Sequence, residues 1–147
     1  MATNPMVTQG TLNRVRTHVV CSDYTSLNVT SSYMGRSFAR LAFEGDFNQL
    51  IGTGTSAVTS PEPYVFATLT LNLLRTQALS QSWMTQAQSS TSIGDVTAYS
   101  DASTFDAVTL SNCVIRSIDP GAYDGTDPVV RVELRGLFYV NDDMWSY

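Results

Sequence analysis

A strict alternation of apolar and polar side chains marks the middle of the chain. At residues 65–73 every second position is Val, Ala or Leu, and Thr68, Thr70 and Asn72 lie between them. A period of two residues indicates a β-strand with one buried and one polar face. The polar face of this strand is uncharged and rich in hydroxyl groups, which gives a first indication of function.

The period changes immediately after this strand. Leu79, Trp83 and Ala87 recur every four residues, which predicts a short helix with one apolar stripe. Segments rich in Gly, Pro and Asp separate other runs that have the period of a strand. These further strands are expected at residues 11–21, 27–29, 37–44, 96–99, 107–118 and 129–140.

The last two of these strands have faces of different character. In the strand at 107–118, Val108, Leu110 and Val114 are expected on one face. In the strand at 129–140, the face opposite the apolar residues carries Arg131, Glu133, Arg135 and Tyr139. Two interpretations of the charges stay open: a solvated face with weak cross-strand pairs, or a stripe that pairs with another subunit or protein.

The order of the elements predicts a mainly β protein. About seven strands and one helix favour an antiparallel β-sandwich or partly closed barrel with one flanking α-helix. The length of 147 residues suits a single domain, 1–147. Residues 1–10 are polar and lack a period, so we expect an N-terminal arm. Residues 45–63 predict a long polar loop, and a loop of that length is usually functional or partly disordered.

Composition narrows the classes of function. The chain has 13 acidic residues against 8 basic ones, all of them arginine, for a net charge of −5. An acidic protein is poorly suited to ordinary nucleic-acid binding, which requires neutralisation of phosphates. Only 14% of the residues are charged, about half the usual fraction, which indicates a surface largely given over to partners.

The start of the chain and its apolar runs bear on location. The first residues have no basic start and no apolar block, so no signal peptide is predicted. No apolar run approaches the ~20 residues of a membrane span, so we expect no membrane anchor. The protein is therefore expected to stay in the cytoplasm, at least initially.

The candidates for nucleophilic chemistry are few. His18 is the only histidine, and Cys21 and Cys113 are the two cysteines. His18 and Cys21 would point to opposite faces of one strand, so a Cys–His pair would need Cys113 beside His18. The alternative is an ordinary strand histidine with two buried free thiols, which is the usual state of cysteine in the cytoplasm.

Two loops resemble ligand sites only superficially. Asp119, Asp124 and Asp127 lack the spacing of a calcium loop and fit a turn better. The glycine-rich segment at 52–56 lacks the lysine of a phosphate-binding loop and fits a flexible loop. No pair of carboxylates is placed as an acid/base couple, so we predict no enzyme, no metal and no cofactor.

Several whole stretches of the chain resemble the tail tube protein of contractile-tailed bacteriophages. The resemblance covers about residues 10–145. The stretches that carry it are LNRVRTHVV (12–20), LAFEG (41–45), AVTSPEPY (57–64), LLRTQ (73–77), GDVT (94–97) and LRG (134–136).

The resemblance implies a structural subunit of the virion tail without catalysis. Such proteins form homohexameric rings that stack into a tube, and strands of all six subunits close one shared barrel around a lumen. The implied partners are the tail sheath, the tape-measure protein, the baseplate hub and the tail terminator. DNA passes through during genome ejection without specific binding, and assembly takes place in the host cytoplasm. Related tubes occur in contractile injection and type VI secretion systems.

Under this hypothesis the residues divide into three groups. The acidic balance fits a channel that repels DNA. The lumen-facing candidates are Glu44, Asp46, Thr68, Thr70 and Asn72. The candidates for a subunit or sheath interface are Arg131, Glu133, Arg135 and Trp145. The candidates in the loop between rings are Ile51, Thr53, Thr55 and Glu62.

Overall fold

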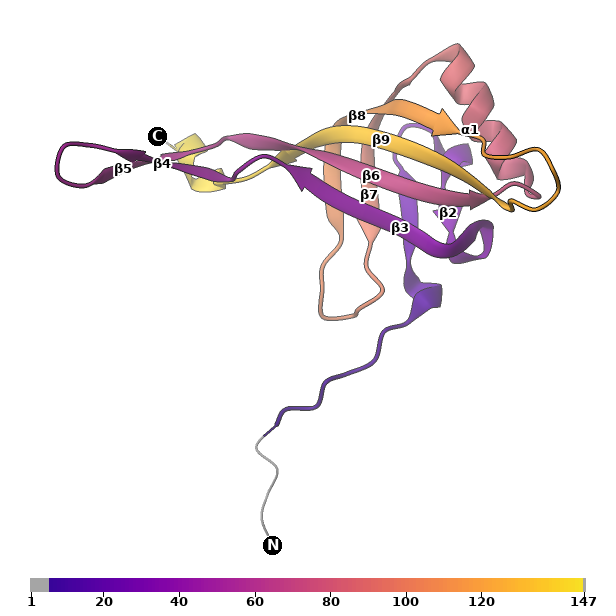
Figure 1. Ribbon diagram of the computed structural model, residues 1–147, viewed down its shortest axis with the longest axis horizontal. Helices are drawn as coiled ribbons and strands as arrows, with labels where there is room; N and C mark the ends of the chain where they lie inside the picture. Colours follow the sequence, from indigo (N-terminus) through magenta and orange to yellow (C-terminus); the bar gives the residue numbers. More distant parts are fainter. Residues whose placement is uncertain (1–5, 147) are drawn as a thin grey trace, which may run out of the picture.

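The computed structural model describes residues 6–146 and is built around one antiparallel sheet (Figure 1). Its strand order is β2-β1-β7-β8-β9-β6-β3, and a separate hairpin pairs β4 with β5. The bounds are β1 His18–Cys21, β2 Val29–Thr30, β3 Met34–Glu44, β4 Asn48–Gly52, β5 Ala57–Pro61, β6 Tyr64–Leu74, α1 Ala78–Ser89, β7 Ser92–Tyr99, β8 Val108–Asp119 and β9 Val129–Tyr139. Short 3₁₀ helices lie at Arg14–Arg16, Thr25–Leu27, Ser31–Tyr33 and Asp142–Ser146. The predicted mainly β class with one helix is confirmed.

The strand predicted at 65–73 is β6, and it lies between β9 and β3. It pairs with β9 in unbroken register from Tyr64 opposite Tyr139 to Leu74 opposite Val129. In β6 every second residue from Val65 to Leu73 is buried and the residues between them are more exposed, as the alternation predicted; in β9 the same pattern runs from Val130 to Gly136. The long flat half of the molecule, β8-β9-β6-β3, is thus defined by strict period-two sequences.

The other half of the sheet curls back over the apolar face of this flat half. Strands β7, β1 and β2 continue from β8, so that the seven strands form a nearly closed, barrel-like sheet (Figure 1). Helix α1 packs at its end, and Trp83 from this helix is fully buried. The core that results includes Val19, Leu27, Leu69, Leu71, Leu73, Trp83, Ile93, Val96, Leu110, Val132 and Leu134.

Two strand predictions are corrected by the structure. The strand predicted from residue 11 begins only at His18, because Arg14–Arg16 form a 3₁₀ turn in which Val15 is exposed. In β8 the predicted face of Val108, Leu110 and Val114 is broken after Leu110. Asn112 has a positive φ of 52°, and the register with β9 shifts there. This β-bulge turns Cys113 and Ile115 into the core and leaves Val114 exposed.

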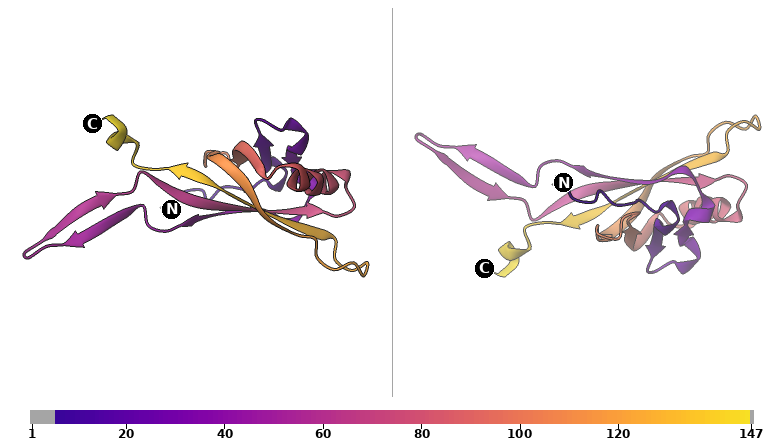
Figure 2. Two further views of the ribbon diagram at one scale, coloured as in Figure 1. Left: turned by 90° about the horizontal axis from the view of Figure 1, so that it is seen from above. Right: turned by 90° about the horizontal axis from the view of Figure 1, so that it is seen from below.

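The segment at 45–63 is an ordered hairpin and not the loop without regular structure that its polar composition suggested. Strands β4 and β5 pair from Asn48 opposite Pro61 to Gly52 opposite Ala57. The hairpin projects from one end of the sheet, at the opposite end from the 119–128 connection (Figure 2). Residues 6–13 have no helix or strand, and the first five residues of the expected arm lie outside the described residues.

Candidate assembly surface

The uncharged and charged residues predicted as separate groups lie on one face of the flat half of the sheet. The β6–β9 register places Thr68 opposite Arg135, Thr70 opposite Glu133 and Asn72 opposite Arg131. We call this the open face, because no second layer covers it within residues 6–146. The strand registers assign it Arg40, Ala42 and Glu44 from β3, the even-numbered residues 64–72 from β6, the odd-numbered residues 131–139 from β9, and Val114, Arg116, Ser117 and Asp119 from β8.

Glu44 is the centre of a polar cluster on the open face. Its carboxylate accepts a hydrogen bond of 2.8 Å from the Thr68 hydroxyl and another of 2.8 Å from Nη2 of Arg135. Arg116 lies farther away, with Nη1 3.9 Å from the carboxylate. The Thr68 hydrogen bond and then the arginines lower the pKa of Glu44. The cluster links all four strands of the flat half across this face.

The open face is not acidic. By the strand registers it carries four arginines (Arg40, Arg116, Arg131, Arg135) against three carboxylates (Glu44, Asp119, Glu133). The net negative charge of the chain therefore arises elsewhere. A repulsive, acidic wall was one expectation from the sequence, and this face offers nearly balanced charge instead.

The two ends of the open face differ. At the end toward the 119–128 connection, Arg40, Thr70, Asn72 and Arg131 line a polar hollow of about 560 Å³. Toward the hairpin, the face becomes aromatic. Tyr64 and Phe66 meet edge to face, and the Arg135 guanidinium lies 4.2 Å from the Phe66 ring centroid.

Trp145 extends this aromatic end. It belongs to the C-terminal 3₁₀ helix, packs edge-on against Tyr139 and is 65% exposed. Tyr64, Phe66 and Tyr139 are also exposed. Exposed aromatic residues in contact with one another are typical of a surface that is covered by a partner.

Asn141 fixes the base of the hairpin. Its side-chain Nδ2 donates to the carbonyl oxygens of Phe47 and Glu62, at 2.9 and 2.8 Å, on the two chains that enter and leave the hairpin. The Glu62 N–H also donates to the Phe47 carbonyl at 3.0 Å. Asn141 has a positive φ of 54°, a conformation that asparagine tolerates better than most residues. Sequence reasoning missed this residue; the only available signal was an asparagine directly after a strand.

The predicted inter-ring residues fall at two places on the hairpin. Ile51 lies on β4, while Thr53 and Thr55 form the tip. There the Thr53 N–H donates to the Ser56 carbonyl, and the Thr53 hydroxyl accepts from the Ser56 N–H. Glu62 lies at the base, in a hollow that also includes Asp46. Asp46, predicted as a lumen residue, thus lies in the turn before the hairpin and not on a strand of the open face.

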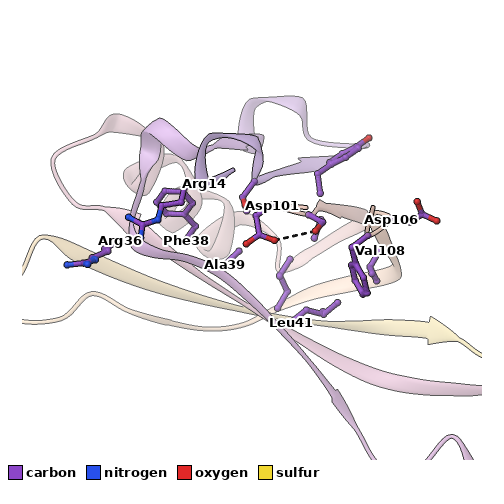
Figure 3. Close-up of a pocket in the computed structure, with 14 residues that line it drawn as sticks. Arg14, Arg36, Phe38, Ala39, Leu41, Asp101, Asp106 and Val108 are labelled. Atoms are coloured by element: carbon purple, nitrogen blue, oxygen red, sulfur yellow. Dashed lines mark hydrogen bonds between the residues drawn. The ribbon is translucent and has the colours of Figure 1, made fainter. Parts of the chain in front are cut away.

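A groove of about 430 Å³ lies on the other side of β3, at the seam where the barrel is not closed (Figure 3). Phe38, Ala39 and Leu41 of β3 form part of its apolar wall. Its charged residues come from different segments: Arg14 precedes β1, Arg36 belongs to β3, and Asp101 and Asp106 lie in the β7–β8 connection.

The structure does not assemble the Cys113–His18 pair. His18 pairs with Tyr99 on β7 and stacks on its ring at 4.1 Å, whereas Cys113 pairs with Gly94, five residues or about 16 Å along the same strand. Burial raises the pKa of Cys113 to about 12 and that of Cys21 to about 11. Both thiols are fully buried, as predicted, and neither is a reactive thiolate at neutral pH.

The aspartates of the 119–128 connection hold the loop itself. Asp119 accepts from the Gly121 N–H, Asp124 from the Thr126 N–H and hydroxyl, and Asp127 from the Val129 N–H. These are turn contacts. Within residues 6–146 no group of three His, Cys, Asp or Glu side chains is arranged to hold a metal ion. The same residues include no helix long and apolar enough to cross a bilayer.

Comparison with known proteins identifies the class of fold. No protein-family model matches the sequence, and no curated protein matches it. Among solved structures, a chain of the virion of a native gene transfer agent particle is similar at a TM-score of 0.55 and 10% identity, over 85% of this chain and 95% of that one. A chain of the gene transfer agent tail, solved with C6 symmetry, is similar at a TM-score of 0.53 and 10% identity, over 86% of this chain and 96% of that one.

A third structure belongs to a different particle. The tube-terminating cap of the anti-feeding prophage is similar at a TM-score of 0.50 and 15% identity, over 93% of this chain and 97% of that one. The three chains thus come from a virion, a tail and a tube-terminating cap, and each match covers 85% or more of this chain. The chain therefore has the fold of a phage tail-type protein, which confirms the resemblance at the level of fold.

Proposed function

We propose that this chain is a structural subunit of a phage-type tail tube, in which rings of six copies stack around a lumen that conducts DNA during ejection. The observation that carries the proposal is the flat half-sheet with a long unpaired edge. The outer edge of β3 pairs with no strand within residues 6–146, while the inner side of this half-sheet is covered by the protein's own core. Such an edge is suited to an arrangement in which neighbouring copies close a common barrel.

The similar tail structure supports the number six. That gene transfer agent tail was solved with C6 symmetry, and its chain shares this fold over 86% of the present chain. In the proposed ring the polar half of the open face, with Thr70, Asn72 and Arg131, lines the lumen. Its charges are nearly balanced, so that DNA is neither strongly held nor strongly repelled.

The remaining assignments follow from the tube. The hairpin and the aromatic end serve contacts between copies, and they include Ile51, Thr53, Thr55, Glu62 and Trp145. The tail sheath, the tape-measure protein, the baseplate hub and the tail terminator are the proposed partners in a virion tail assembled in the host cytoplasm. No catalysis is proposed. The alternative is the tube protein of a related contractile injection or type VI secretion system.

Negative-stain microscopy together with light scattering tests the proposal. Six chains of 16.0 kDa give a ring of about 96 kDa, and at high concentration or with a baseplate seed the rings should extend into tubes. A six-fold ring in class averages is the expected result. Compact monomers at every concentration, with and without a seed, would exclude a tube subunit.

A further inference from the structure

The four arginines of the open face differ in whether they have a partner. Arg116 and Arg135 lie 3.9 Å and 2.8 Å from the carboxylate of Glu44, which ties both of them to one acid. Arg40 and Arg131 are exposed and form no ion pair with any of residues 6–146. These two guanidinium groups are therefore free to bind an anion from outside the chain.

Both free arginines line the polar hollow of about 560 Å³ at the end of the open face toward the 119–128 connection. An irregularity in β3 accompanies this hollow. From Met34 to Ala39, β3 advances five residues while its partner on β6 advances only two, so three residues have no place in the ladder. The Asn72 side chain donates from Nδ2 to the carbonyl oxygen of Ser37 within this irregular stretch. The hollow is thus built into the fold.

The two arginines flank strand β6. Arg40 lies opposite Thr70, and Arg131 lies opposite Asn72 on the other side of the same strand. Strands are about 4.8 Å apart and rise about 3.4 Å per residue, so two strand spacings and an offset of two residues put the two arginine Cα atoms about 12 Å apart. Two long side chains at that distance can contact neighbouring groups on one polyanion.

The carboxylates of the same region do not occupy these arginines. Glu133 lines the hollow, and its carboxylate accepts a hydrogen bond of 3.3 Å from the Ser117 hydroxyl. Asp119 is the strand partner of Arg131, but its carboxylate accepts from the Gly121 N–H. Arginine is longer than either acid, so its guanidinium reaches farther from the sheet. An anion that approaches the open face therefore meets the guanidinium groups first.

The chemistry of the hollow suits the phosphates of a duplex. A guanidinium offers parallel N–H donors that fit phosphate oxygens, and it keeps its charge at neutral pH. In the proposed ring, two arginines from each of six copies would form a belt of twelve at one level of the lumen. A duplex carries one negative charge per about 1.7 Å of its axis, distributed around its whole circumference, so it presents phosphates to every side of such a belt. An acidic peptide also fits a guanidinium but meets only one side at a time.

We propose that Arg40 and Arg131 form a binding site for the phosphate backbone of duplex DNA. The inference rests on the proposed tube and adds to it a belt of weak contacts in a wall whose charge is otherwise nearly balanced. Phosphate contacts position a duplex without reading its sequence. The belt thus centres the passing DNA in the lumen, whatever its sequence.

Fluorescence anisotropy of a labelled, blunt-ended duplex, added to rings or tubes of the full chain over a series of salt concentrations, tests the site. Arg40→Gln together with Arg131→Gln should lower the affinity about tenfold or more and make the plot of log K against log salt shallower by at least about one unit. Arg40→Lys together with Arg131→Lys keeps both charges and should retain the salt slope.

A matched control removes two charges from another part of the chain. Arg14→Gln together with Arg16→Gln changes the 3₁₀ turn before β1, outside the open face, and should leave the affinity within about twofold. Should the double variant of the hollow fail to form rings, Arg131→Gln alone provides the measurement, because β9 lies away from the unpaired edge of β3. It should make the salt plot shallower by about one unit.

Microscopy of the same samples separates this inference from the tube itself. If the variants form six-fold rings but bind the duplex as tightly and with the same salt slope as the unsubstituted chain, the phosphate site is wrong while the tube stands. If a poly-glutamate peptide binds the rings more tightly than the duplex does, and loses that affinity in the double variant, the hollow takes an acidic polypeptide and the assignment to DNA is wrong. If the unsubstituted chain forms no ring with or without a seed, the tube and the belt both fail.

Discussion

The contact between β9 and β8 offers a quantitative test of the core. A Cβ atom added at Gly136 would lie 2.5 Å from Sγ of Cys113 and 3.0 Å from Cβ of Leu110. Both neighbours are buried and cannot move into solvent. Gly136→Ala should therefore lower the free energy of unfolding by about 1–3 kcal/mol, the usual cost of overpacking a core.

Urea unfolding followed by far-UV circular dichroism measures this loss, at concentrations low enough to keep the chain monomeric. For a chain of this size, each kcal/mol corresponds to a fall in Tm of about 2–4 °C. Gly54→Ala is the matched control, because no atom lies within 4 Å of a Cβ at that turn position. It should change the free energy of unfolding by less than about 0.5 kcal/mol.

A double-mutant cycle identifies the atom responsible. Cys113→Ala removes the nearest atom, so Gly136→Ala should cost at least about 1 kcal/mol less in that background than in the unsubstituted chain. The coupling free energy between the two substitutions would then be favourable, as expected when the second substitution removes a clash created by the first. An equal cost in both backgrounds would refute the account, since the loss would then come from the strand backbone and not from the Cys113 sulfur.

Two further predictions concern the hairpin base and the open face. Asn141→Gly removes the two side-chain hydrogen bonds and accepts the positive φ without strain, so residues 45–63 should exchange amide hydrogen faster and tubes should form poorly. Unchanged exchange at the hairpin base would contradict the positioning role. Glu44 has a pKa below its ordinary value of 4.5, so its stabilising contribution is present above that value and disappears as the pH falls through the lower, folded-state pKa. Glu44→Gln should therefore flatten the acid side of the stability–pH curve in urea titrations between pH 2 and 7, and a curve of unchanged slope would exclude Glu44 as its source.

The sequence predicted correctly those strands whose pattern of buried and exposed residues follows one regular alternation. Strand β6 has one buried face over its whole length and β9 has one from Val130 to Gly136, so the period-two alternation is clear in both. In β8 the bulge at Asn112 shifts the alternation of buried and exposed residues, and no pattern in the sequence predicts this bulge. The hairpin was missed because its apolar residues lie on both faces, so that no amphipathic period exists.

The candidate site was predictable residue by residue but not as a surface. Thr68 and Arg135 were each singled out from their own strand. That they are cross-strand neighbours depends on the β6–β9 register, which involves residues 67 positions apart in the chain. The role of Asn141 depends likewise on contacts with Phe47 and Glu62, formed only after the strands have come together.

The bulge at Asn112 has a geometric consequence for an assembly. An extra residue in one strand bends that strand and increases its local twist. Strand β8 is where the flat half-sheet turns into the half that wraps the core, so the backbone of one asparagine contributes to the curvature of the wall. In a ring of six copies, that curvature would help to set the bore of the channel. The width of such a tube would then depend partly on the bulge in β8, which lies where each subunit's sheet bends around its own core.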